Sequence, residues 1–387
     1  MKILYISKTS IKKGGGSEKK AEVLTKKLAS RGHDVTVVCG KTSTNLSKKV
    51  RDNNHTIRHV KCVPDIILKQ PIVGFYLPRY LFPLISLPIL LLLMFQRSFD
   101  VIIEDQTPFP MFGIILKILF KTPVVAVQHE YFDCSCYEVY DPVTASIQLL
   151  LQNFLRVFDY AAVIVPSTHV KKQFINYGIP EDRLYTIVNG IYRENYHTES
   201  TNKNPGHLIV LGRITKRKGQ SAVIKAVSQL VERGYDIHLH VVGDGPYKGK
   251  IIELVDELGI ESNVTIHGYV NEDKKIELLN LSEIFMFASR QEGLGNVLLE
   301  AMAAECAIVA RYLPVYMDFF QNGVNGTLIR DPNAKDLAKE AELLLCDRDR
   351  LKSIQTQNKS KVKEYTWESY TDKAESVLEQ INERVQH

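Results

Sequence analysis

The chain has 387 residues, 45% of them hydrophobic and 24% charged, and a formal net charge of +5. This length supports more than one hydrophobic core and predicts two domains of somewhat under about 200 residues each. The net charge is too small, on a chain of this length, to indicate a nucleic-acid partner. Six scattered cysteines, and an N-terminus that begins like a strand rather than a signal peptide, fit a reducing cytoplasm.

Short apolar runs alternate with helical periodicity along the chain. The first half reads KILYIS, DVTVVCG, DVIIED, TPVVAVQH and AAVIVPS, and the second half repeats the pattern from HLIVLGR to TLIR. Strands that alternate with helices form βαβ units and parallel sheets. The sequence therefore predicts an α/β protein with two Rossmann-like, doubly wound domains in tandem.

The polar stretch 193–207 contains Asn, Pro and Gly without periodicity, and we predict that it links the two domains. The N-terminal domain then covers 1–192, the C-terminal domain covers 208–365, and a last helix covers 366–387. Ligands of open α/β sheets bind outside the carboxyl ends of the strands. We therefore expect a cleft at the place where two such sheets face each other.

The segment 80–96 is apolar but contains Pro83 and Pro88, and it is shorter than the roughly 20 residues of a spanning helix. It is compatible with a membrane-spanning helix, with an interfacial helix and with a helix packed inside the protein.

Four lysines share one face of the helix that we expect from about Ser17. At about 100° per residue, this face lies opposite Ala21, Leu24 and Leu28. The basic face is either solvated or rests on anionic lipid, which would make the protein a peripheral membrane protein. The four lysines are Lys19, Lys20, Lys26 and Lys27.

Two loops have the composition of a phosphate site. Three glycines, 14–16, precede the first predicted helix, whose free N–H groups suit an anion, although a flexible turn would look the same. In the second half, Arg213 directly follows a strand and is itself followed by the basic run 216–218. These four cations could neutralise a diphosphate, with arginine as the bidentate partner. The alternative for this basic run is a solvated turn.

Three other patterns carry little weight. VVGDGPYKG at 241–249 has G-x-G-x-x-x-G spacing, and without an N-terminal G-x-G-x-x-G it argues poorly for an NAD-dependent oxidoreductase. DRD at 347–349 has the D-x-D form of many metal-dependent sugar transferases but follows a helix in a polar turn. Cys134 and Cys136 are followed by no second pair at zinc spacing, so we expect no metal site.

The strongest pattern is RQEGLGNVLLEAMA at 290–303, which follows the β run IFMFASR. Glycines keep the turn open, and the helix is expected to begin near Asn296. Glu292 should project from the turn, and Glu300 should lie about one further turn along the helix. The partial positive charge of the helix N-terminus should point to the same cleft.

Together, GGGSEKKAEVLTKKLASRGHDVTVV, VNGIY, LGRITKRKG, VVGDGP, NVTIHGYV and this E-x7-E resemble the retaining glycosyltransferases of family 4 (glycosyl transferases group 1), which have the GT-B fold. The resemblance covers nearly the whole chain in the right order. The tail from Trp367 is similar to the family's C-terminal helix, which crosses back onto the first domain. The implied reaction moves a hexose from a nucleotide-diphosphate sugar to a sugar or lipid-linked acceptor, with retention of anomeric configuration, in glycan or glycolipid biosynthesis. The implied location is the cytoplasm, including the inner face of the membrane.

The resemblance also implies roles for individual residues. Arg213 and Lys218 hold the diphosphate, Glu292 contacts the sugar and Glu300 takes the ribose hydroxyls. His129 lies beside the donor sugar. As the bond to the anomeric carbon breaks, charge grows on the departing diphosphate, and fixed cations stabilise it, so neither metal nor other cofactor is required.

Backbone groups complete the implied donor site. The N–H groups of Gly295, Asn296 and Val297 add to the phosphate cradle, while Gly15 and Gly16 approach it from the other domain.

The chain departs from the family after Glu300, where AMAAECAIVARYLPVYMDFF replaces a small glycine-containing turn and a later glycine pair. Glu305, Arg311 and Tyr312 stand where small residues are usual. An unusual donor sugar, weakened activity, or a non-catalytic sugar-nucleotide-binding protein with a degenerate site would each account for this departure.

Overall fold

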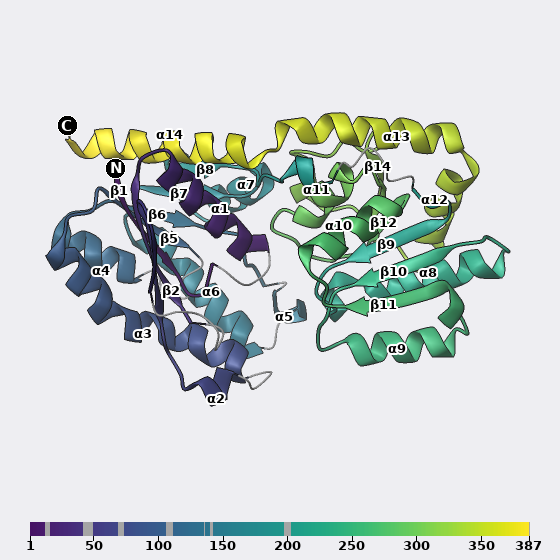
Figure 1. Ribbon diagram of the computed structural model, residues 1–387, viewed down its shortest axis with the longest axis horizontal. Helices are drawn as coiled ribbons and strands as arrows, with labels where there is room; N and C mark the ends of the chain where they lie inside the picture. Colours follow the sequence, from purple (N-terminus) through teal and green to yellow (C-terminus); the bar gives the residue numbers. More distant parts are fainter. Residues whose placement is uncertain are drawn as a thin grey trace. The chain divides into compact units, whose positions relative to one another are not determined.

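The computed structural model describes residues 1–11, 16–41, 49–68, 73–105, 111–134, 136–139, 142–196 and 203–386 (Figure 1). Contacts divide the chain into two units, which we call unit 1 (Met1–Asn189 with Trp367–His387) and unit 2 (Gly190–Thr366). Each unit is built on a largely or wholly parallel sheet with helices between the strands, which confirms the predicted α/β class with two such domains.

Unit 1 has an eight-stranded sheet in the order β3-β4-β2-β1-β5-β6-β7-β8. All neighbouring strands are parallel except β3 and β4, which pair antiparallel at one edge. The strands are β1 (Lys2–Ser7), β2 (Asp34–Gly40), β3 (Lys49–Asp52), β4 (His55–Val60), β5 (Val101–Asp105), β6 (Val124–Val127), β7 (Ala162–Val165) and β8 (Leu184–Thr186). The central strands are buried along their whole length because helices cover both faces of the sheet.

The helices of unit 1 come from both ends of the chain. Helix α14 packs beside α1, as Figure 1 shows, although the rest of unit 1 ends at Asn189. The helices are α1 (Gly16–Ser30), α2 (Asp65–Leu68), α3 (Val73–Gln96), α4 (Met111–Phe120), α5 (Cys136–Val139), α6 (Pro142–Val157), α7 (Thr168–Asn176) and α14 (Trp367–Gln386).

The lysines of α1 do not form the basic face that the sequence pattern predicts. Lys20 is only 2% exposed, and Lys27 donates to Glu368 of α14. Lys26 pairs with Glu22, one turn before it, at 2.6 Å. The four lysines therefore do not share one exposed face, because α14 and the sheet cover part of this helix. Leu24 and the other apolar residues predicted to pack inside are buried.

Helix α3 contains the apolar segment 80–96 and continues through Pro78, Pro83 and Pro88. No helix in the described part of the chain is long and apolar enough to cross a membrane.

One face of α3 is buried and another is exposed. Phe82 and Leu93 are 1% and 3% exposed, whereas Leu84, Leu92 and Phe95 are more than half exposed. The segment therefore packs against unit 1 and also presents apolar side chains at the surface.

Unit 2 has a six-stranded parallel sheet in the order β11-β10-β9-β12-β13-β14. Its strands are β9 (His207–Leu211), β10 (His238–Val242), β11 (Val264–Gly268), β12 (Ile284–Phe287), β13 (Ala307–Arg311) and β14 (Gly326–Ile329). Its helices are α8 (Gln220–Glu232), α9 (Lys248–Glu257), α10 (Glu272–Leu281), α11 (Asn296–Ala303), α12 (Ala334–Cys346) and α13 (Arg348–Lys361).

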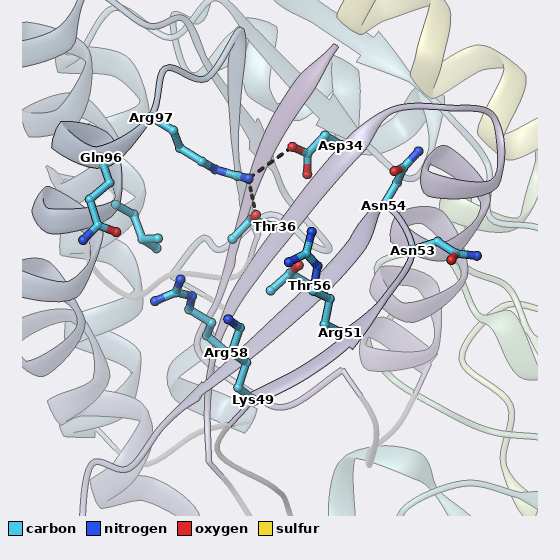
Figure 2. A pocket seen from close by; sticks show the side chains of 11 residues that line it. Asp34, Thr36, Lys49, Arg51, Asn53, Asn54, Thr56, Arg58, Gln96 and Arg97 are labelled. Carbon is cyan, nitrogen blue, oxygen red and sulfur yellow. Dashed lines mark hydrogen bonds and ion pairs between the residues drawn. The ribbon is translucent and has the colours of Figure 1, made fainter.

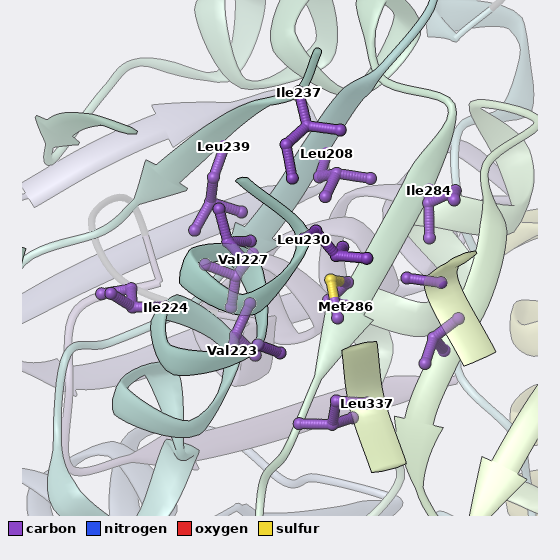
Figure 3. Packing of buried hydrophobic residues seen from close by; sticks show 14 of the residues in the cluster. Leu208, Val223, Ile224, Val227, Leu230, Ile237, Leu239, Ile284, Met286 and Leu337 are labelled. Carbon is purple, nitrogen blue, oxygen red and sulfur yellow. The ribbon is translucent and has the colours of Figure 1, made fainter. Parts of the chain in front are cut away.

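The core of unit 2 joins these strands to helices α8 and α12, which pack against each other. Figure 3 shows Leu208, Leu239 and Met286 of the strands meeting Val227 of α8 and Leu337 of α12. This core holds the carboxyl ends of β9 and β12 in fixed positions, and the loops that follow those two strands carry the predicted donor residues.

The stretch 193–207, predicted as the linker, is described at 193–196 and 203–207, and these residues lie within unit 2. Arg193–Asn195 form a 3-10 helix, and the ammonium group of Lys203 donates to the carbonyls of Ser282 and Ala304. The side chain of Lys203 therefore binds backbone carbonyls of unit 2. The contact boundaries fall at Asn189 and Thr366.

Candidate active site

The turn after β12 depends on glycine. Gly295 precedes α11 with φ 86°, in the left-handed region that favours glycine. A Cβ at this position would lie 2.5 Å from Cε1 of Tyr316, so the space also excludes a side chain. Because the helix begins directly afterwards, the N–H groups of Asn296 and Val297 lie in its first turn, at the positive end of the helix dipole.

Lys218 and Glu292 meet across two neighbouring strands. Lys218 lies in a 3-10 helix after β9, and its ammonium nitrogen is 2.6 Å from Oε1 of Glu292, which follows β12. Both side chains are largely buried, at 13% and 10% exposed. The structure thus joins the cation expected to hold diphosphate to the carboxylate expected to contact the sugar.

Further backbone contacts fix these two loops to each other. Arg217 donates from its guanidinium to the carbonyl of Gln291 and accepts a hydrogen bond from the N–H of Arg290 on its own carbonyl. Gly219 follows with φ 72°, and a Cβ there would lie 2.3 Å from the carbonyl oxygen of Ala288. The loops are therefore in contact along their backbones as well as through the ion pair.

Glu300 also has a partner, which the sequence did not indicate. Lys275 of α10 lies 2.9 Å from Oε1 of Glu300 and 3.0 Å from Oε1 of Glu272. Burial by itself lowers the pKa of Lys275, but the two carboxylates outweigh it and raise that pKa above its ordinary value. Burial, together with the charge of Glu300, raises the pKa of nearby Tyr196 well above its usual range.

Arg213 follows Gly212 in the loop after β9, and its carbonyl accepts a hydrogen bond from Gln220 at 3.2 Å.

The two glycines of VVGDGP are accounted for by close packing of the backbone. A Cβ on Gly243 would lie 2.0 Å from the carbonyl oxygen of Gly212, and one on Gly245 would lie 2.2 Å from that of Ile214. They allow close packing against the Arg213 loop, so this stretch needs no dinucleotide to account for it.

The DRD pattern is a helix cap. The carboxylate of Asp347 accepts from the N–H of Arg350 at the start of α13. Among the described residues, no group of three or more His, Cys, Asp and Glu side chains could hold a metal ion.

The atypical residues after Glu300 have partners within unit 2. Arg311 pairs with Asp331, and Glu305 lies 2.9 Å from Lys359. The ring of Tyr312 is covered by the guanidinium of Arg330 at 5.1 Å.

Tyr316 was not predicted as a site residue. It is fully buried under Gly295, and its hydroxyl has no hydrogen-bond partner in the part of the chain that the structure describes. Burial, and then the charge of Glu292, raises the pKa of this tyrosine well above its usual range. Only the departure from the family pattern around 304–320 could have drawn attention to it.

In unit 1, His129 lies in a buried polar chain at the carboxyl ends of the strands. Asp105, the last residue of β5, accepts from Nε2 of His129 at 2.6 Å and from the hydroxyl of Tyr5 at 2.6 Å. Lys20 reaches Nδ1 of the same ring at 3.1 Å. Both ring nitrogens are therefore occupied.

The charged groups around His129 shift one another's pKa values. Burial lowers the pKa of Lys20 to about 8, although Asp105 opposes it. Burial and then Lys20 lower the pKa of His129. Burial by itself raises the pKa of Asp105, but the positive charges of His129 and Lys20 outweigh burial and lower that pKa.

Of the two glycines predicted to approach the donor, Gly16 is the first residue of α1, whereas Gly15 lies outside the described residues.

Two family comparisons match the chain one after the other. Residues 14–195 match the family described as Glycosyltransferase Family 4, and residues 193–362 match the family described as Glycosyl transferases group 1. Together the matches run through nearly all of both units.

Curated relatives are glycosyltransferases of modest similarity. An uncharacterized glycosyltransferase of Methanocaldococcus jannaschii is 25% identical over 68% of this chain and 71% of its own length. A capsular polysaccharide biosynthesis glycosyltransferase of Staphylococcus aureus is 25% identical over 51% of this chain and 56% of its length. A Campylobacter jejuni N-acetylgalactosaminyltransferase, named for a diphospho-undecaprenol-linked acceptor, is 25% identical over 56% and 60%. The chain thus spans little more than half of the last two proteins.

Solved structures match over the whole chain. Sucrose-phosphate synthase from Thermosynechococcus elongatus has a TM-score of 0.84 at 16% identity, covering 98% of this chain and 99% of that one. HepE of Anabaena, solved with UDP, has a TM-score of 0.75 at 18% identity, covering 98% and 100%. At these identities the structures show a shared fold. With the family matches in both units, they identify the chain as a glycosyltransferase with the GT-B fold.

Proposed function

We propose that the chain is a retaining hexosyltransferase of family 4, which moves a hexose from a nucleotide-diphosphate sugar to a sugar or lipid-linked acceptor in glycan or glycolipid biosynthesis. The observation that carries the proposal is the Lys218–Glu292 pair beside the N-terminus of α11. It supplies a cation and a carboxylate at the carboxyl ends of adjacent strands, where α/β sheets bind ligands.

The residues of unit 2 suit a departing diphosphate. Lys218 and Arg213 provide positive charge, and the first N–H groups of α11, at Asn296 and Val297 after Gly295, provide donors. The charge that grows on the diphosphate as the glycosidic bond breaks is stabilised by groups already in place. We propose that this set works without a metal or other cofactor, and that the nucleotide-sugar is the co-substrate.

The two glutamates have separate roles in this proposal. Glu300 accepts hydrogen bonds from the ribose hydroxyls, which an ionised carboxylate can do with both oxygens. Glu292 contacts the sugar. For His129, Gly15 and Gly16 of unit 1, the roles that the resemblance implies remain predictions.

The acceptor and location are proposed on the same basis. We place the protein in the cytoplasm, at the inner face of the membrane when its acceptor is lipid-linked. The names of the Campylobacter and Staphylococcus relatives support a glycan or lipid-linked acceptor. Contact with the membrane would then be peripheral and would not involve Lys20, which is buried.

Nucleotide release from a panel of UDP-, GDP- and ADP-sugars tests the proposal. We expect one donor class to turn over, and Lys218→Ala to lower kcat/KM by about 10- to 100-fold, because a charged hydrogen bond contributes about 1.5–3 kcal/mol. Glu300→Ala should act mainly on the KM of the nucleotide-sugar. Lys225→Ala, which removes an exposed lysine of helix α8 that belongs to no proposed site, is the control and should match the wild type.

Three other outcomes are informative. Binding without turnover would favour the sugar-nucleotide-binding alternative with a degenerate site. A product with inverted anomeric configuration, seen by NMR, would exclude retention. If no sugar-nucleotide binds, or if both site variants equal the control, the assignment of these residues fails.

A further inference from the structure

A cavity of about 180 Å³ lies in unit 1, bounded by β2, β3, β4 and the end of α3 (Figure 2). It lies at the amino end of β2, since Asp34 is the first residue of that strand. Substrates of α/β sheets bind at the opposite, carboxyl end. The cavity is therefore separate from the groups that the proposed function uses.

The lining is strongly basic. Four cations face one carboxylate, and Arg97 already neutralises that carboxylate, Asp34, at 3.1 Å. The other three cations, Lys49, Arg51 and Arg58, make no ion pair and no side-chain hydrogen bond with any described residue. Nε of Arg58 is buried without a hydrogen-bond partner among these described residues.

The strand register places these charges on one face of the sheet. Lys49 of β3 lies directly opposite Arg58 of β4, and Arg51 lies opposite Thr56 in the next row of that face. Like charges directly opposite each other on neighbouring strands destabilise a sheet. Figure 2 shows the side chains of Lys49, Arg51 and Arg58 among those that line the cavity. A bound anion would remove the repulsion that the fold otherwise tolerates.

We infer that this cavity binds a phosphate group between Lys49, Arg51 and Arg58. Guanidinium groups hold phosphate oxygens in pairs, while the lysine acts as a point charge. The cavity is smaller than the roughly 300–1,000 Å³ of ordinary small-molecule sites, so it suits a head group rather than a nucleotide-sugar. This inference goes beyond the proposed function and does not depend on it.

The phosphate could belong to a lipid or to a soluble molecule, and the surface beside the cavity favours a lipid. Leu93 of α3 lines the cavity, while Phe95 is 77% exposed and contacts Phe120 of α4 edge to face. Ile118 and Leu119 of α4 are also more than half exposed. Apolar side chains beside a cationic site are the composition of surfaces that rest at a bilayer interface.

The test compares two double variants with the same loss of charge. Lys49→Gln with Arg51→Gln removes two exposed cations of the cavity, and Lys172→Gln with Lys373→Gln removes two exposed lysines elsewhere in unit 1. One arm measures binding of pyrophosphate by calorimetry. The other measures sedimentation with phosphatidylglycerol vesicles and with phosphatidylcholine vesicles at constant ionic strength.

We expect the cavity variant to bind anionic vesicles about 30-fold more weakly than the control variant, since each lysine or arginine near an anionic surface contributes about fivefold. A loss in both arms supports a phosphate site open to soluble ligands, and a loss in the vesicle arm alone assigns it to lipid. Equal binding by the two variants in both arms overturns the inference. Nucleotide release from the donor sugar should stay at the wild-type level in both, which keeps this test apart from that of the proposed function.

Discussion

The ammonium nitrogen of Lys218 lies 2.6 Å from Oε1 of Glu292, and both side chains are largely buried. Each group has the chemistry to contact the donor, yet in this structure they satisfy each other. A phosphate that binds at Lys218 therefore competes with this carboxylate for the charge of the ammonium group. Such competition links donor affinity to the strength of a contact within the protein.

Glu292→Gln tests this competition. The neutral amide competes less well for Lys218, so we expect the variant to bind nucleoside diphosphate more tightly, by about tenfold, in calorimetry. Because the sugar loses its carboxylate partner, kcat should fall. Weaker binding of the nucleoside diphosphate by the variant would contradict the idea that the pair competes with the ligand.

Lys275→Met should raise the KM for the donor, because Lys275 positions the Glu300 carboxylate. Removing one member of a largely buried pair should also lower the free energy of unfolding by about 1–3 kcal/mol. Lys274→Met is the matched control, since Lys274 is an exposed neighbour that pairs with Glu277. Denaturant unfolding and donor kinetics, measured on both variants, check the prediction, and identical behaviour would refute it.

The stabilisation by Lys275 should also depend on pH. The pKa of Lys275 is raised in the folded state, so the folded protein retains its proton more strongly than the unfolded chain. The contribution is complete below the ordinary lysine pKa and is lost as pH rises through the folded value. The stability gap between the wild type and Lys275→Met should therefore narrow at alkaline pH, and a constant gap would contradict the ion-pair explanation.

Lys20→Met should give a more stable protein at pH 7, by about 1–3 kcal/mol, because the buried ammonium of Lys20 has a pKa of about 8 against 10.5 in the unfolded chain. The unfolded chain binds more protons between these two values, so wild-type stability should rise with pH through this window. The difference from the variant should then disappear above about pH 10.5. Thermal unfolding from pH 7 to 11 measures it. A variant less stable than the wild type at pH 7 would show that the contacts of Lys20 with His129 outweigh the cost of burial.

Gly295→Ala should destabilise unit 2 by about 1–3 kcal/mol, because alanine is strained at φ 86° and its Cβ would meet the ring of Tyr316. Gly249→Ala is the control within the same unit. Gly249 lies in helix α9 with no atom within 4 Å of the added Cβ, so alanine should stabilise by about 0.5–1 kcal/mol. Chemical denaturation of both variants measures the contrast, and equal effects would contradict it.

Local patterns predicted the parts of the site that local geometry determines. The turn with Gly295 before α11 follows from glycine, helix propensity and the preceding strand, all within a dozen or so residues. Lys275 and Tyr316 reach the same site from other elements, and no local pattern indicates such contacts. The partner of Lys20, His129, is likewise more than 100 residues away. The local pattern of α1 therefore indicated a helix with a solvated lysine face.

The sequence pattern did not predict the strands β3 and β4 at the edge of the sheet, and the reason is different. β3 is short and largely exposed, with the sequence KVRD, and lacks the apolar alternation that marks a strand. Its charged side chains suit an exposed edge strand, and Lys49 and Arg51 among them line the cavity.

Because of helix α14, the two units are completed at different times during translation. Arg31 and His33 at the end of α1 bind Glu375 of α14, so unit 1 includes a helix that is synthesised after all of unit 2. Unit 2 is one continuous stretch and can complete its sheet while the chain is still being made. Unit 1 is mostly translated first, but it cannot acquire its last helix until the whole of unit 2 has been translated.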